Sequence, residues 1–197
     1  MSEDFLKKNH SDANMLVAIW VRPLSEREIA DKENDIVSAE DKLLIVLDRI
    51  QLWAELTGIK PDVLHWSKEQ RYYFDKIFKN VSQAHVYENT TKHLIPGITS
   101  GFNACVFAYG TTGSGKTYTM LGTDSNPGIS VQTINDMFNA ISSDPDNKYS
   151  IKVSYVEIYN EVIRDLLVAH SKNTYLDLWD DPIKGIKIAG VTEHKVE

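Results

Sequence analysis

The amino-acid sequence predicts an α/β fold in which helices flank a mostly parallel sheet. Residues 104–109, Ala-Cys-Val-Phe-Ala-Tyr, are continuously apolar, which is typical of a strand buried on both faces of a parallel sheet. Segments with strand-like and helix-like patterns alternate on either side of this run, as they do in α/β sheets. A glycine-rich loop at 110–115 follows the run directly, so we expect the chain to turn there and enter a helix.

The part of the chain before the apolar run is expected to hold three short strands. Residues 15–21 are apolar with a β-branched bias and end just before an Arg-Pro pair, which predicts a strand that stops at the proline. Residues 43–47 and 72–74 are further strand candidates, whereas the charged segment 25–41 is expected to be a solvated excursion. Residues 48–70 predict no more than a helical turn, which a glycine and a proline would stop.

Helix and strand patterns continue on both sides of the glycine-rich loop. Residues 83–98 place their apolar side chains roughly on one face, so they predict a helix that a proline at position 96 breaks or kinks. After the loop, Ser130 is expected to cap a further helix. The remaining elements are a long strand at 149–158, a turn of helix or an irregular strand at 161–167, and a hairpin made by 176–179 and 186–189.

Composition limits the class of protein. The chain has 197 residues, 42% of them hydrophobic, which is enough for the core of one ordinary domain. Its single cysteine excludes a disulfide framework, and its formal net charge of -7 argues against a nucleic-acid binder whose whole surface is basic. No apolar run approaches the roughly 20 residues that a membrane span needs. Residues 1–14 are polar, show no signal-peptide pattern and are expected to be a loose leader, so the sequence predicts a soluble intracellular domain.

The glycine-rich loop carries the motif with the clearest chemistry. Residues 110–117 fit the pattern G-x-x-x-x-G-K-[ST] without a mismatch, directly after a predicted strand. Glycines let successive backbone N–H groups turn toward a phosphate, and the positive end of the following helix points at the same anion. The lysine is then expected to reach the β- and γ-phosphates, and the last hydroxyl to bind Mg²⁺. The predicted phosphate-binding residues are Gly110, Thr111, Thr112, Gly113, Ser114, Gly115, Lys116 and Thr117, with Thr117 as the metal ligand.

Hydrolysis of a nucleotide would also need a carboxylate near the metal and a group that orients the attacking water. Asp48 ends an apolar run of the kind that carries a metal-binding carboxylate, but it precedes the loop and Arg49 follows it, so a hairpin end is the alternative. Asp165 and Asp177 follow weaker runs and are expected to be surface or turn residues. The six histidines show no metal-ligand spacing. The sequence therefore predicts no catalytic residue in this chain.

Residues 107–120 read Phe-Ala-Tyr-Gly-Thr-Thr-Gly-Ser-Gly-Lys-Thr-Tyr-Thr-Met, and this string closely resembles the phosphate loop of kinesin motor domains. Further blocks fall in kinesin order across nearly the whole chain, so the resemblance is highly specific. They are Val17 to Leu24, similar to the first strand, Phe74 to Phe78, similar to the second, Gly101 to Ala104, similar to the approach to the third, and Ser154 to Leu167, similar to the fourth strand and its sequel.

The resemblance implies how the chain would bind ATP and Mg²⁺. The loop 110–117 would hold the phosphates and the magnesium ion, while Pro23 and Tyr118 would sandwich the adenine with Arg22 nearby. One position departs from the kinesin pattern, because Trp20 stands where the first arginine of an Arg-x-Arg-Pro string is expected. A tryptophan at that position either stacks on the base or packs against the protein.

The resemblance covers the first part of a kinesin motor domain. Residues 15–197 are similar to its N-terminal part, whereas the switch strings Asn-x-x-Ser-Ser-Arg-Ser-His and Asp-Leu-Ala-Gly-Ser-Glu do not occur in the chain. The expected fold is therefore an incomplete kinesin motor fold of the P-loop NTPase type. Residues 122–129 and the long segment before the second strand look like those of kinesin-eight motors. Such motors walk on microtubules, shorten their ends and in some branches set cilium length. The implied partner is thus the microtubule, and the implied location is the cytoplasmic cytoskeleton or the cilium.

Three functions stay open at this point. The chain is the ATP-binding front part of a kinesin motor, or a nucleotide-binding or interaction module without ATPase and motor activity, or an unrelated P-loop kinase or small NTPase that uses Asp48. The third would show a lid rich in arginine after the loop, but only Arg164 lies beyond Lys116. For Lys184 and Lys187, in the predicted hairpin, the resemblance implies a contact with tubulin, and a solvated charged face is the alternative.

Overall fold

The computed structural model describes residues 15–47, 70–168, 175–182 and 185–196. Its internal contacts divide the chain into two units, Met1–Ser142 and Ser143–Glu197. No helix in these described ranges is long and apolar enough to cross a membrane. The predictions for the leader and for residues 48–69, including the metal role considered for Asp48, lie outside the described residues.

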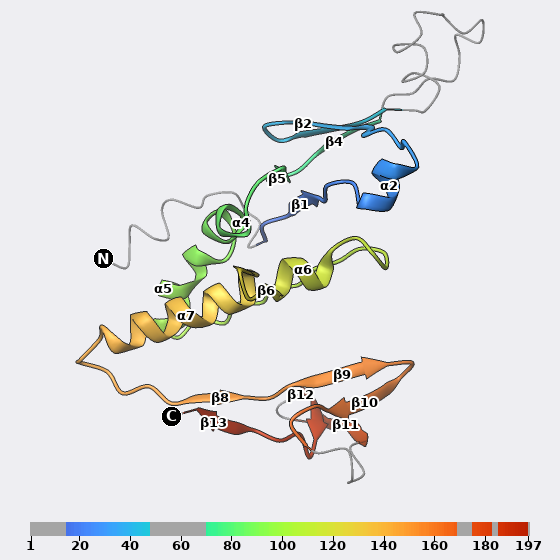
Figure 1. Cartoon of the computed structure of the whole chain (residues 1–197). Coiled ribbons are helices and arrows are strands. Elements are labelled where there is room, and N and C mark those ends of the chain that lie inside the picture. Colours follow the sequence, from blue (N-terminus) through green and yellow to red (C-terminus); the bar gives the residue numbers. More distant parts are fainter. Residues whose placement is uncertain (1–14, 48–69, 169–174, 183–184, 197) are drawn as a thin grey trace, which may run out of the picture. The chain divides into compact units, whose positions relative to one another are not determined.

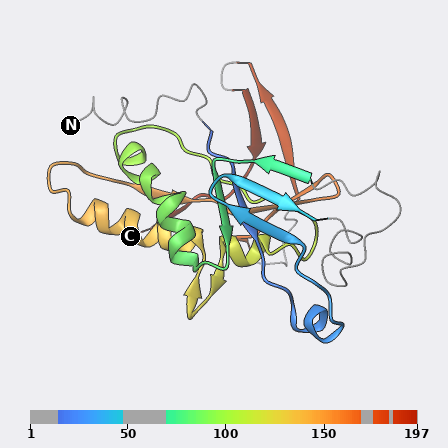
Figure 2. The ribbon, with the colours of Figure 1, turned by 90° about the horizontal axis from the view of Figure 1, so that it is seen from above.

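The first unit contains a parallel strand pair and a three-stranded antiparallel sheet (Figures 1 and 2). β1 (Ala18–Val21) runs parallel to β5 (Lys76–Lys79), and this register places Trp20 opposite Phe78. The antiparallel sheet has the order β2-β3-β4. Its strands are β2 (Val37–Glu40), β3 (Leu43–Val46) and β4 (Gln70–Tyr73). The parallel pair and the surrounding helices confirm the predicted α/β class.

The charged segment 25–41 is more regular than its composition predicts. It contains α2 (Glu26–Ala30) as well as β2, and Ser25 caps the helix. The Ser25 hydroxyl accepts the backbone N–H of Glu28, and the Glu28 carboxylate accepts the backbone N–H of Ser25. This reciprocal capping satisfies two backbone donors and explains why so polar a segment begins a helix.

Helices supply most of the core of the first unit. The segment predicted as one helix is divided into α4 (Gln83–Asn89), the 3₁₀ turn η1 (Lys92–Leu94) and α5 (Ile95–Thr99). Pro96 lies in the first turn of α5, where a missing N–H costs nothing, so it begins a helix and does not kink one. α4 and α5 lie against α7 (Ile129–Ser142), as Figures 1 and 2 show. The buried core residues are Phe78, Val86, Tyr87, Ile95 and Ile129.

The segment between α5 and α7 contains α6 (Lys116–Met120) and a small hairpin of β6 (Gly122–Thr123) and β7 (Asn126–Pro127). The expected helix after this hairpin is present as α7, but Ser130 lies within its first turn because the helix already begins at Ile129. The prediction that Ser130 caps this helix is therefore wrong, because Ser130 is the second residue of the helix and does not precede it.

The predicted central strand at 104–109 is not formed. A strand is defined by hydrogen bonds to a neighbour, and residues 102–110 have no strand partner among the described residues. Without a neighbouring strand or a covering layer the apolar side chains stay in solvent, and Phe107 and Tyr109 are 74% and 96% exposed. The single cysteine, Cys105, is exposed in the same segment.

The second unit consists of β-strands. A four-stranded antiparallel sheet has the order β12-β11-β10-β9, and a separate antiparallel pair joins β8 to β13. The strands are β8 (Ile151–Val153), β9 (Val156–Tyr159), β10 (Val162–Asp165), β11 (Tyr175–Asp181), β12 (Gly185–Ala189) and β13 (His194–Val196). The predicted hairpin is confirmed as β11 and β12, which pair in register.

Two predictions for the second unit need correction. The long strand expected at 149–158 is divided, because β8 pairs with β13 whereas β9 pairs with β10. Asp165 was expected at the surface or in a turn, yet it is buried and its carboxylate accepts the backbone N–H groups of Leu167 and Thr192. These hydrogen bonds, led by that from Thr192, lower the pKa of the carboxyl. Asp177 is exposed, as predicted.

Candidate phosphate-binding site

The glycine-rich loop turns through backbone conformations that favour glycine. Gly113 and Gly115 have φ angles of 82° and 96°, and both lie in the left-handed region. Gly115 is also the residue from which α6 begins. Glycine reaches this region without the steric cost that a Cβ brings, so the motif spacing and the observed turn agree. The loop therefore leads directly into the N-terminus of α6, as the sequence predicts (Figure 1).

Backbone donors of the loop are available to a ligand. Within the described part of the chain, the N–H groups of Gly113, Gly115 and Lys116 donate to no acceptor, whereas that of Ser114 is bound to the Thr111 carbonyl at 3.2 Å. Unpaired N–H groups at the start of a helix attract anions, because the helix dipole adds partial positive charge there. The arrangement can therefore bind an anion such as a phosphate.

The lysine of the motif lies across the loop. Its Nζ donates to the backbone carbonyls of Gly110 at 2.9 Å and Thr111 at 2.8 Å. Both acceptors are neutral, so the ammonium charge of Lys116 is not compensated by these two contacts. A phosphate at the loop would offer a charged acceptor in their place, and charge-assisted hydrogen bonds are the stronger ones.

The remaining loop residues show what a metal ion would meet. Thr117 is exposed in the first turn of α6. Its hydroxyl makes no hydrogen bond to the described residues, so it is free to accept a ligand. A single hydroxyl does not hold Mg²⁺ alone, and the described ranges contain no cluster of three or more His, Cys, Asp or Glu side chains suited to a metal. The residues therefore fit a Mg²⁺ ion whose ligands would be the Thr117 hydroxyl and the phosphate oxygens of a bound nucleotide.

Tyr118, the expected base-binding residue, contacts three elements. Its ring lies 6.0 Å from that of Trp20 in β1, measured between centroids, with the two planes at 78°. Its hydroxyl accepts a hydrogen bond from Asn126 Nδ2 at 3.0 Å. Its backbone carbonyl accepts a hydrogen bond from the Gln83 side chain of α4. The structure thus brings β1, α4 and the small hairpin together at the residue after the phosphate loop.

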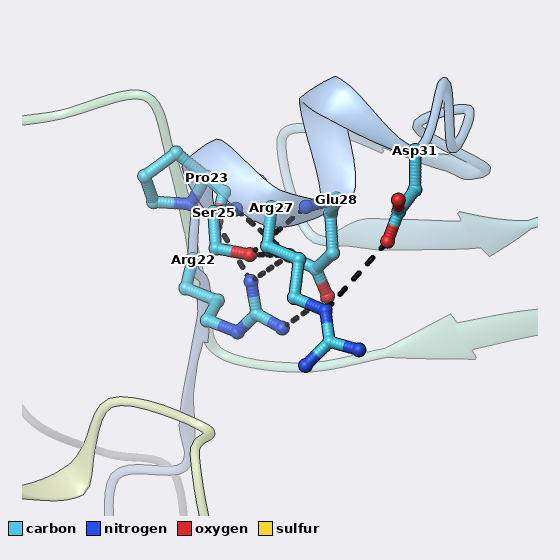
Figure 3. Close-up of polar contacts among 6 residues, drawn as sticks. All are labelled: Arg22, Pro23, Ser25, Arg27, Glu28 and Asp31. Atoms are coloured by element: carbon cyan, nitrogen blue, oxygen red, sulfur yellow. Dashed lines mark hydrogen bonds and ion pairs between the residues drawn. The ribbon is translucent and has the colours of Figure 1, made fainter.

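Arg22 and Pro23 lie at the junction between β1 and α2 (Figure 3). The Arg22 guanidinium donates to both carboxylate oxygens of Glu28, at 2.7 and 2.8 Å, and to the Pro23 carbonyl at 3.0 Å. The hydrogen bond from Arg22, followed by those from Ser25, holds the pKa of the Glu28 carboxyl well below its usual range. The charge of Arg22 is therefore paired within the protein.

The structure places the predicted site residues in two groups. The eight loop residues and Tyr118 are continuous along the chain, whereas Arg22 and Pro23 are tied to α2. Sequence reasoning missed Glu28 and Gln83 as partners of these residues. The string Ser25-x-x-Glu28 is a capping-box signal that would have revealed Glu28. No comparable local signal points to Gln83.

A groove of about 630 Å³ lies elsewhere in the first unit. It runs along β5 and the start of α4, and Asp75, Lys76 and His85 are among its lining residues. None of the predicted site residues lines it.

Comparison with known proteins identifies the family. The family model for the kinesin motor domain matches residues 20–197. The chain belongs to the kinesin motor domain family. Human kinesin-like protein KIF19 is 46% identical to this kinesin chain over an alignment of 186 residues, and the match covers 92% of the chain and 18% of KIF19. Kinesin-like protein KIN-8B of Arabidopsis thaliana is 40% identical over 184 residues, covering 92% of the chain and 22% of that protein. These relatives confirm the resemblance to kinesin-eight motors.

Solved structures confirm the fold of this kinesin chain. A dimer of KIF14 (391–772) in the two-heads-bound state, with AMP-PNP and in complex with a microtubule, superposes with a TM-score of 0.77 at 30% identity. The match covers 93% of this chain and 50% of that one. KIF14 (391–755) with ADP, also in complex with a microtubule, gives a TM-score of 0.70. The chain thus spans half of these motor structures and about a fifth of the curated relatives named above. Membership of the kinesin family excludes the third alternative, an unrelated P-loop kinase or small NTPase.

Proposed function

We propose that the chain is the ATP-binding part of a microtubule-based kinesin motor. In the full motor domain, ATP hydrolysis would be coupled to movement on microtubules or to shortening of their ends. The observation that carries this proposal is the phosphate loop 110–117, whose free N–H groups lie at the start of α6 in a chain of the kinesin family. The relatives bound to AMP-PNP and ADP support a nucleotide as the ligand.

The residues of this chain would bind the nucleotide through its phosphates. The N–H groups of Gly113, Gly115 and Lys116 would face the phosphate oxygens, and the Lys116 ammonium would leave two neutral carbonyls for a charged acceptor. The Thr117 hydroxyl would hold Mg²⁺ together with phosphate oxygens, and the ion would neutralise charge on the phosphates. Tyr118 and Pro23 would lie on the two sides of the adenine, with Arg22 nearby.

Microtubules are the proposed partner, and the microtubule cytoskeleton of the cytoplasm, including the cilium, is the proposed location. The solved kinesin relatives were bound to microtubules, which supports this partner. Lys187 lies on β12 opposite Trp179 in the antiparallel hairpin, while Lys184 lies outside the described residues. Asp177, Asp180 and Asp181 are also on this hairpin, so the charges near Lys187 are mixed.

Nucleotide binding by the 197-residue chain tests the first step of the proposal. We expect Mg-ATP to raise the melting temperature and Lys116→Ala to abolish the rise, because the variant lacks the cation that faces the phosphates. At 100 times the dissociation constant, binding to the native state adds about 2.7 kcal/mol to the free energy of unfolding. Lys148→Ala, an exposed lysine of the second unit, is the matched control. An equal ATP-induced shift in wild type and Lys116→Ala would contradict phosphate binding at this loop.

A nucleotide-binding or interaction module without ATPase and motor activity is the second candidate. Neither kinesin switch string occurs among the 197 residues, so this candidate is kept beside the motor until an experiment separates the two. The two candidates differ in microtubule-stimulated phosphate release by the endogenous protein, purified with an antibody against this chain. Stimulated release that Lys116→Ala abolishes supports the motor. ATP binding with no phosphate release at saturating microtubules supports the module.

A further inference from the structure

An aromatic pair links the first strand to the phosphate-loop helix. Trp20 of β1 packs against the core cluster around Phe78, and its ring contacts that of Tyr118 at near-perpendicular planes. Such edge contacts between aromatic rings are favourable and directional. Trp20 is therefore fixed by the core on one side and fixes the ring of Tyr118 on the other.

Two hydrogen bonds restrain the same tyrosine from other directions. Asn126 Nδ2 donates to its hydroxyl at 3.0 Å, and the Gln83 side chain donates to its carbonyl. Gln83 is 1% exposed, so its position is set by the packing around α4. The Trp20 contact and the Asn126 hydrogen bond thus restrict the χ angles of Tyr118, while the Gln83 hydrogen bond holds its backbone.

The restrained ring is nevertheless open to a ligand. Tyr118 is 41% exposed, and a near-perpendicular contact with Trp20 leaves at least one broad face of the tyrosine ring uncovered by the indole. Aromatic faces bind the planar bases of nucleotides by stacking. The tyrosine directly follows Lys116 and Thr117, so a base stacked there would belong to the nucleotide whose phosphates occupy the loop.

We propose that Trp20 is a positioning residue that sets the orientation of Tyr118 for stacking on the nucleotide base. This inference rests on the proposed nucleotide binding and adds a division of roles within that site. The loop binds the phosphates whatever is attached to them, whereas the pair Trp20–Tyr118 supplies the affinity for the base. A ring that is already oriented loses less conformational freedom when the base binds, so the pre-set orientation raises affinity.

The test compares Mg-ATP with Mg-tripolyphosphate, which has the phosphates but no base. Isothermal titration of the 197-residue chain gives both dissociation constants, and their ratio measures the contribution of the base. We expect Trp20→Leu, which keeps an apolar side chain on the core, to weaken ATP binding about tenfold and to leave tripolyphosphate binding unchanged. Trp20→Phe keeps an aromatic ring, so its ratio of the two dissociation constants should stay close to that of the wild type. Trp179→Leu, at an exposed tryptophan of the second unit, is the matched control and should change neither constant.

Each other outcome overturns the inference in a distinguishable way. An unchanged ratio in Trp20→Leu shows that Trp20 does not position the base-binding ring, while the proposed phosphate site stands. Equal losses for both ligands in Trp20→Leu and Trp20→Phe show that the indole only supports the fold of the loop. If wild type binds neither ligand, the proposed function fails and this inference fails with it.

Discussion

The substitution Gly122→Ala tests how strictly the small hairpin after α6 depends on its glycine. Gly122 has a φ of 72°, in the left-handed region, and it pairs with Pro127 across the hairpin. A Cβ added there would lie 2.3 Å from the Asn126 carbonyl oxygen and 2.3 Å from the Gly128 nitrogen. Both atoms belong to the backbone, so the clash cannot be relieved by rotating a side chain.

Two costs add to give the expected destabilisation. The left-handed conformation costs a residue with a Cβ about 1–2 kcal/mol. Opening the hairpin would also lose backbone hydrogen bonds such as that from the Gly128 N–H to the Leu121 carbonyl at 2.8 Å, and each is worth about 1 kcal/mol. We therefore expect Gly122→Ala to lower the free energy of unfolding by about 2–4 kcal/mol.

Gly101→Ala is the matched control for this substitution. Gly101 also has a positive φ, 94°, but nothing lies within 4 Å of a Cβ added there. It should therefore show only the conformational cost of about 1–2 kcal/mol. Urea unfolding followed by far-UV circular dichroism gives both values, and their difference isolates the steric clash. If the two variants are destabilised equally, the hairpin accommodates the Cβ and the reasoning from the contacts is refuted.

Two further predictions concern hydrogen-bonded carboxylates of the first unit. Glu28→Gln should destabilise the protein at pH 6, because Arg22 loses its ionic partner. Since the folded-state pKa of Glu28 is lowered, this stabilisation is complete above the unfolded value of about 4.3 and fades as the pH falls below it. The difference in urea midpoint between wild type and variant should thus narrow at pH 3, and a constant difference would argue against the ion pair. Tyr87→Phe should cost about 1–3 kcal/mol, because the Tyr87 hydroxyl donates to Asp136 at 2.6 Å between α4 and α7. Tyr155→Phe, at an exposed tyrosine, should change the urea midpoint little, and equal effects of the two variants would contradict a role for the Asp136 hydrogen bond.

The phosphate loop was predictable because its information is local. Its glycines, lysine and threonine are contiguous, and the observed turn into α6 depends on φ angles that glycine adopts most readily. The same holds for the β11–β12 hairpin, whose strands pair across a short connection. Strand β1 was predicted for a similar reason, since an apolar run before a proline is a local signal.

Features that depend on distant partners were not predictable in the same way. The apolar run 104–109 has the composition of a buried strand, but a strand also needs neighbours, and none is found within the described residues. Asp165 was misplaced because its acceptor role depends on the Thr192 backbone, 27 residues further along the chain. The departure at Trp20 was visible in the sequence, yet only its contact with Tyr118 shows that the indole packs against a site residue.

Because Cys105 is exposed, its reactivity can report on the state of the apolar run 104–109. The thiol is the only one in the chain and lies in the run that has no strand partner in the described structure. Its rate of alkylation by a maleimide therefore reports directly on whether that run is covered. A fast rate indicates a bare segment, and protection indicates that another part of a polypeptide has paired with it. The same residue offers one defined attachment point for a fluorophore a few residues from the phosphate loop.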